Sequence, residues 1–83
     1  MMAIEERVIS GVVELYGTAS CPFTSDLRDQ LEWERRPFVE YDVEADPSAL
    51  ARLIEMTGGR MVPALVEAGR VISVGWRGHG CMV

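Results

Sequence analysis

The chemistry that this sequence offers centres on one cysteine, Cys21, in the segment YGTASCPFT (residues 16–24). A β-type run ends where this segment begins, and a helical pattern starts directly after Cys21. Free backbone N–H groups and the positive end of the helix dipole should therefore face the sulfur. At such positions the pKa of a thiol falls from about 8.5 to roughly 3.5–7.5, which favours the nucleophilic thiolate. Pro22 suits the first helical position, because its φ is already helical and an N–H is not needed there.

The alternative for Cys21 is a small buried hydrophobic side chain, which is a common fate of a lone cysteine. Its place at a helix start next to Pro22 favours the reactive interpretation. Thr24 lies about one helical turn later, on the same side of the helix. Its hydroxyl could bond to nearby backbone as an ordinary first-turn residue, or donate to the thiolate and lower the pKa of Cys21. These two roles are compatible.

A second thiol, Cys81, lies with His79 in a glycine-rich tail. One interpretation is a loop that happens to contain a thiol and an imidazole. The other is that Cys81 resolves a mixed disulfide formed on Cys21. Closing a loop of about sixty residues would constrain the unfolded chain by about 4 kcal/mol. A metal site made of these two cysteines and His79 would be short of ligands, so we expect no metal.

The composition bounds the class of protein. A chain of 83 residues predicts one domain, and 48% hydrophobic with 25% charged residues is typical of a globular protein. No segment approaches the roughly 20 apolar residues of a membrane span. The net charge of −5 argues against a nucleic-acid partner. Acidic residues near the N-terminus and the low number of cysteines predict a cytoplasmic protein, which we expect to be a monomer.

Periodicity and turn residues predict an α/β domain with the order β-α-β-α-β-β. Strands are expected at residues 12–16, 38–43, 64–67 and 70–74, and helices at residues 22–36 and 47–57. The second helix should bury Leu50, Leu53 and Ile54. A strand, helix and strand imply a parallel pair with a right-handed crossover, to which the final hairpin adds antiparallel strands in a mixed four-stranded sheet. Within the single domain 1–83, residues 1–11 should be weakly ordered, and residues 75–83 should form a tail in loop conformation.

Four features occur together in a characteristic order: a strand ending at Tyr16-Gly17, the motif CPFT at residues 21–24, a Val62-Pro63 pair before the third strand, and Gly75-Trp76 after the fourth. With this combination the chain resembles the glutaredoxin family of the thioredoxin-like fold, from about residue 12 to residue 77. Gly80-Cys81 adds a similarity to the Uxx-star group of that family, some members of which are thought to carry selenocysteine where Cys21 stands.

The resemblance implies a thiol–disulfide oxidoreductase. Cys21 would attack a disulfide-bearing or glutathionylated protein or small thiol, with glutathione or Cys81 as the resolving thiol. The family match also implies a cis bond before Pro63, which turns the backbone of Val62 toward the nucleophile. Candidates for binding substrate or glutathione are Thr18, Pro22, Phe23, Val62, Pro63, Gly75, Trp76 and Arg77.

The sequence departs from the better-known glutaredoxins at several points. Thr24 replaces the second motif cysteine, and Thr18 stands where a basic residue is usual. The acidic residue that normally follows a glycine pair after the last strand is missing. Both groups that usually hold glutathione at its two ends are therefore absent, and Arg77 or Arg60 could bind a carboxylate of glutathione instead. The usual final helix gives way to the glycine-rich tail, which should leave one flank of the sheet thinly covered.

Other interpretations stay open. Trp76 and Arg77 could simply close and solvate the end of a short sheet. The protein could be a non-catalytic module that binds a partner through Phe23, Val62 and Trp76 on a redoxin fold. It could also be a glutathione-dependent iron–sulfur carrier, as monothiol relatives of the family suggest.

Overall fold

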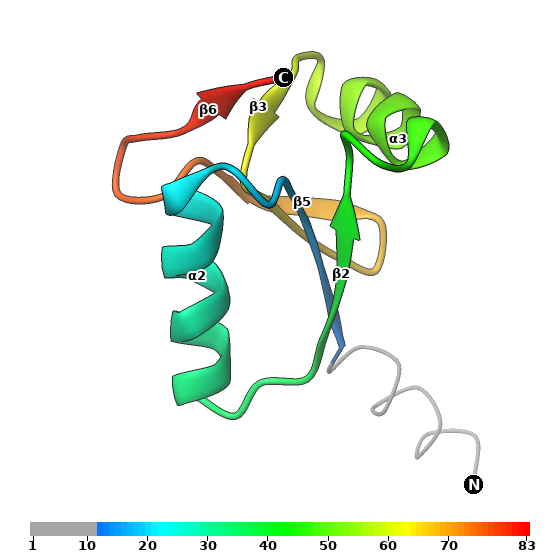
Figure 1. The fold of residues 1–83 in the computed structure, drawn as a ribbon. Coiled ribbons are helices and arrows are strands. Elements are labelled where there is room, and N and C mark those ends of the chain that lie inside the picture. The colour runs from blue at the N-terminus through cyan, green and yellow to red at the C-terminus, as the bar shows by residue number, and fades with distance from the viewer. Residues whose placement is uncertain (1–11) are drawn as a thin grey trace, which may run out of the picture.

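A computed structural model describes residues 12–83 as a four-stranded sheet with a helix on each face (Figure 1). The strands are β1 (Val13–Gly17), β2 (Phe38–Asp42), β4 (Ala64–Glu67) and β5 (Arg70–Val74), in the order β2-β1-β4-β5. β1 is parallel to β2 and antiparallel to β4, and β4 is antiparallel to β5. The predicted mixed sheet is therefore confirmed. Our expectation for residues 1–11 lies outside the described residues.

The core consists of two apolar clusters, one on each face of the sheet. Alternate residues of a strand point to opposite faces, so Leu15 and Tyr16 of β1 belong to different clusters. The cluster under helix α2 (Pro22–Trp33) comprises Val13, Leu15, Leu27, Leu31 and Leu65. The cluster under helix α3 (Pro47–Thr57) comprises Tyr16, Cys21, Val43, Ala49, Leu53, Val62, Ala64 and Val66. All five residues of β5 are exposed, so the thin cover predicted at this flank is confirmed.

Helix α2 ends at Trp33, so the predicted end at residue 36 is wrong. Arg35 adopts a left-handed conformation with a φ of 57°. This places the N–H groups of Arg35 and Arg36 against the carbonyls of Glu32 and Leu31, each at 3.0 Å. The pattern is that of a Schellman closure, in which glycine is the usual left-handed residue. Because arginine stands in that place, the closure could not be predicted from the residue types.

Helix α3 begins and ends where the sequence predicted. The Asp46 carboxylate accepts hydrogen bonds from the hydroxyl of Ser48 at 2.7 Å and from its N–H at 3.0 Å. These bonds, the hydroxyl first, hold the pKa of Asp46 below its ordinary value. Gly58 ends the helix at a φ of 78°. Leu53 is buried as predicted, but Ile54 is 37% exposed, because one step along a helix turns the side chain away from the sheet.

The tail is more regular than the predicted loop. Trp76 and His79 exchange two backbone hydrogen bonds of 2.6 and 2.9 Å across a tight turn, in which Arg77 and Gly78 have φ values of 52° and 83°. The chain then runs back as strand β6 (Cys81–Met82), which pairs antiparallel with strand β3 (Met61–Val62). Figure 1 shows this short pair beyond the start of α2. The expectation of a loop is therefore wrong for β6.

None of the helices within residues 12–83 combines the length and the apolar character needed to cross a membrane.

Candidate functional site

The candidate site lies at the N-terminus of α2, where Cys21 is the N-cap residue. Its backbone is extended, with φ −92° and ψ 116°, and its carbonyl accepts the N–H groups of Thr24 and Ser25 at 3.1 and 3.3 Å. The sulfur is joined to that of Cys81 in a disulfide, with the two Cα atoms 6.1 Å apart. Cys21 is only 1% exposed in this state. The structure thus brings together two thiols that are 60 residues apart in the sequence.

The loop before β4 completes the surroundings of the disulfide. The bond between Val62 and Pro63 is cis, as the resemblance implied. Val62 is fully buried and is the pairing partner of Cys81 in the β3–β6 ladder. The N–H of Gly75 donates to the carbonyl of Pro63 at 2.7 Å, which ties the end of β5 to this loop. Four of the predicted site residues, Cys21, Val62, Pro63 and Cys81, therefore form one neighbourhood.

The tail is held on both sides of Cys81. The N–H of Val83 donates to the carbonyl of Arg60 at 3.0 Å, and Nε of Arg60 donates to the carbonyl of Val83 at 2.8 Å. On the other side, the His79 ring stacks on Phe23, with ring centroids 5.3 Å apart and planes 16° apart. The guanidinium of Arg60, which the sequence suggested as a partner for a ligand carboxylate, thus binds the tail in this state.

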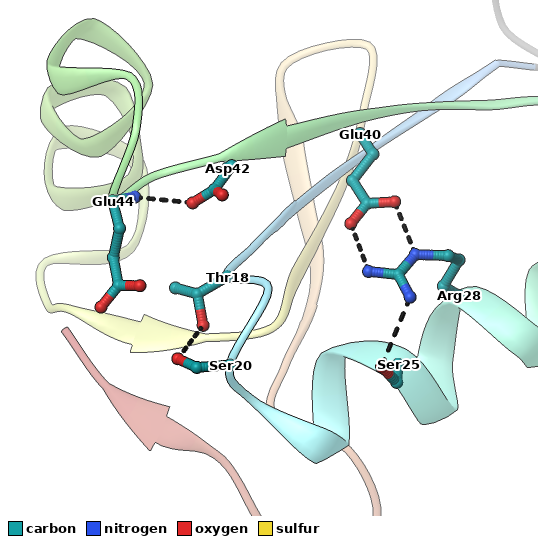
Figure 2. A network of polar contacts seen from close by, with 7 residues as sticks. All are labelled: Thr18, Ser20, Ser25, Arg28, Glu40, Asp42 and Glu44. Carbon is teal, nitrogen blue, oxygen red and sulfur yellow. Dashed lines mark hydrogen bonds and ion pairs between the residues drawn. The ribbon is translucent and has the colours of Figure 1, made fainter.

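Thr24, the last residue of the motif, is fully buried. Its Oγ1 has no hydrogen-bond partner among residues 12–83, so the expected bond to nearby backbone is wrong for the disulfide state. The side chain lies against Gly17: a Cβ on that glycine would come within 2.7 Å of Oγ1. Glycine at the end of β1 therefore makes room for Thr24. Thr18 is buried as well, with its Oγ1 3.4 Å from the hydroxyl oxygen of Ser20 (Figure 2).

An ion pair fixes α2 against the sheet. Figure 2 shows the guanidinium of Arg28 directed at both carboxylate oxygens of Glu40 on β2, at 2.7 and 2.6 Å. This forked geometry restrains orientation as well as distance. Arg28 also lies 3.4 Å from the hydroxyl of Ser25, in the first turn of α2. This pair could not be predicted from the sequence, since the two residues are 12 positions apart and belong to different elements.

A second link, also not predicted, joins α3 to β1. The Arg52 side chain donates to the phenol oxygen of Tyr16 at 3.2 Å and lies 5.0 Å from the ring centre of Tyr41. The Tyr16 hydroxyl in turn donates to Glu14 at 3.0 Å. Burial raises the pKa of Tyr16. These contacts steady the end of β1, which leads into the loop before Cys21.

Trp76 and Arg77 lie along α2. The guanidinium of Arg77 sits 5.1 Å from the ring centre of Trp76. The two residues line a shallow groove of about 490 Å³, whose other lining residues are Asp26, Asp29, Gln30 and Trp33. In residues 12–83, no three side chains of His, Cys, Asp or Glu are grouped so as to hold a metal ion.

The comparisons with known proteins agree with this geometry. Residues 13–72 match the family model for glutaredoxin. The chain belongs to the glutaredoxin family. Proteins of this family are generally oxidoreductases that act on disulfide or glutathionylated substrates and commonly use glutathione. A search of curated proteins gave no significant match.

Solved structures show the same fold. A point mutant of a thioredoxin-like protein is 26% identical, with a TM-score of 0.69, 75% of this chain covered and 80% of that one. The glutaredoxin of Archaeoglobus fulgidus is 18% identical, with a TM-score of 0.71 and coverage of 89% and 84%. Wheat glutaredoxin is 20% identical, with a TM-score of 0.65 and coverage of 89% and 71%. The narrower similarity to the Uxx-star group, the cytoplasmic location and the monomeric state stay predictions.

Proposed function

We propose that this glutaredoxin is a thiol–disulfide oxidoreductase in which Cys21 is the nucleophile and Cys81 the resolving thiol. The observation that carries the proposal is the disulfide between these residues, formed at the N-terminus of α2 and beside the cis Val62-Pro63 bond. The helix dipole and the free N–H groups of the first turn favour a thiolate at Cys21. The resolving cysteine comes from the tail, since the motif itself ends in Thr24.

The reaction runs in two exchanges. The Cys21 thiolate attacks one sulfur of a substrate disulfide, forms a mixed disulfide with it, and releases the other sulfur as a thiolate. The Cys81 thiolate then attacks the Cys21 sulfur, forms the internal disulfide, and releases the second substrate thiolate. The substrate gains two electrons and the protein loses two. Two molecules of glutathione restore the dithiol and leave as glutathione disulfide.

When glutathione reduces the internal disulfide again, we expect it to attack the sulfur of Cys81. A glutathione thiolate that attacks the Cys81 sulfur expels Cys21, and a thiol of low pKa leaves faster. This attack would also release the tail and free the guanidinium of Arg60 from the Val83 carbonyl. Arg60 precedes β3 directly, so its released side chain is our candidate partner for a carboxylate of glutathione. Arg77 is the alternative, in the groove along α2.

Thr24 is our candidate for tuning the nucleophile. Its hydroxyl is buried and has no partner within residues 12–83 while the disulfide stands, and a buried donor gains most from a charged acceptor. On reduction, we propose that it donates to the Cys21 thiolate and lowers the pKa of that thiol.

The thiolate absorbance of reduced Cys81→Ser protein, titrated with pH, tests these assignments. We expect the pKa of Cys21 to lie below the ordinary value of about 8.5. The near-isosteric change Thr24→Val should raise that pKa by about one unit, because it removes a hydrogen bond made only to the charged form. A pKa of about 8.5 or higher in the Cys81→Ser protein would contradict the activated nucleophile. An unchanged pKa in Thr24→Val would contradict the role of Thr24 alone.

A further inference from the structure

The tail lies on β3 as an extended peptide. Met82 pairs with Met61 and Cys81 pairs with Val62 in an antiparallel register, and Val83 continues the contact through its two bonds to Arg60. Strand addition of this kind is a common way to bind a peptide, with main-chain bonds for affinity and side-chain pockets for specificity. The tail thus presents its own cysteine to Cys21 along a path that another peptide could use.

Gly80 marks the tightest point of this path. A Cβ on Gly80 would lie 2.7 Å from the carbonyl oxygen of Val62, 2.8 Å from Cγ of Met61 and 3.0 Å from its Sδ. The Met61 side chain is partly exposed and can move, whereas the Val62 carbonyl belongs to the backbone next to the cis bond. On the other side of the cysteine, the side chain of Met82 is 70% exposed, so the space for a side chain is not restricted there. The structure therefore restricts the residue before the cysteine and leaves the one after it free.

We propose that the tail is an internal stand-in for the substrate, and that the same limit selects substrates. A peptide disulfide docked on β3 would then react well only when the group before its cysteine carries no branch, which in a polypeptide means glycine. Glutathione satisfies this condition, because its γ-linked glutamate places a CH₂ group before the cysteine amide. The proposal rests on the proposed function, since it assumes that Cys21 is the nucleophile.

The test uses full-length Cys81→Ser protein, in which Cys21 is the sole cysteine. Two blocked tetrapeptides, Gly-Cys-Met-Val and Ala-Cys-Met-Val, are each supplied as the symmetric disulfide. The Cys21 thiolate attacks either sulfur, keeps one peptide as a mixed disulfide and releases the other as a thiolate. Mass spectrometry of the protein follows the adduct, and exchange of each peptide disulfide with free glutathione corrects for intrinsic reactivity.

We expect the glycine peptide to react about tenfold faster than the alanine peptide, the order of effect of forcing one methyl group into a filled site. Equal corrected rates, both above those with glutathione in solution, would overturn the selection and leave the nucleophile standing. Rates no higher than in solution for both peptides would instead count against the proposed function.

A second readout needs no peptide. In the otherwise native chain, Gly80→Ala should shift the equilibrium between the Cys21–Cys81 disulfide and glutathione about tenfold toward the dithiol. Gly59→Ala is the matched control, because the described residues leave open space around a Cβ there, and it should leave the equilibrium unchanged. If Gly80→Ala behaves like Gly59→Ala, the steric limit before the cysteine does not exist.

Discussion

Cys21→Ser should abolish the reduction of a glutathionylated peptide by glutathione, with a loss of about two orders of magnitude or more, because serine cannot form the mixed disulfide. Cys81→Ser should keep a glutathione-dependent reaction, since free glutathione can attack the mixed disulfide on Cys21 in place of the tail. Oxidation of NADPH through glutathione reductase measures both rates.

The two serine variants form a matched pair, since each removes one sulfur of the same disulfide. Loss of the internal disulfide is common to both, so a difference in rate isolates the nucleophile from the resolving thiol. Equal residual activity in the two would contradict the role of Cys21. Capture of a partner protein that survives Cys21→Ser, without any exchange in the native chain, would favour the binding module that the sequence left open.

Reduction of the internal disulfide should lower the free energy of unfolding by about 4 kcal/mol. The bridge joins residues 60 positions apart, and a loop of that length loses about this much conformational freedom in the unfolded state. A domain of this size has a total of about 4–12 kcal/mol, so the effect is a large share of its stability. Urea denaturation of the native chain with and without a phosphine reductant measures it.

The Cys81→Ser variant is the control for this urea denaturation. The midpoint of Cys81→Ser should not depend on the reductant, because that variant has no second thiol to pair with Cys21. In the native chain the slope of the transition should also rise on reduction, because the slope follows the surface exposed on unfolding and an unfolded chain without the bridge exposes more of it. A native chain with the same midpoint in both conditions would show that the disulfide contributes nothing to stability.

The sequence predicted the elements whose signals are local. Pro22 and Pro47 each follow a cap residue and open a helix, and the structure begins α2 and α3 there. Ala68-Gly69 turns β4 into β5 as expected. These features depend on the backbone preferences of one or two residues, which act in any surroundings.

The features that the sequence missed depend on contacts between distant segments. β6 has only two residues, which is too short for any hydrophobic pattern, and it exists because β3 is its partner. The left-handed Arg35 is a local feature, but arginine does not signal a conformation that glycine usually adopts. Thr24 packs against Gly17 of β1, and its Oγ1 has no partner among the described residues, which the helical pattern alone did not indicate. The pairing of β6 with β3 and the contact of Thr24 with Gly17 arise only when the whole chain is folded.

Mass spectrometry after a single exchange shows whether Cys21 and Cys81 act as one dithiol. Reduced native protein is mixed with one equivalent of glutathione disulfide and quenched with acid. We expect the mass of the internal Cys21–Cys81 disulfide with no glutathione attached, and for Cys81→Ser a stable glutathione adduct on Cys21. A native protein that keeps glutathione on Cys21 while Cys81 stays a free thiol would show that the two cysteines do not work together.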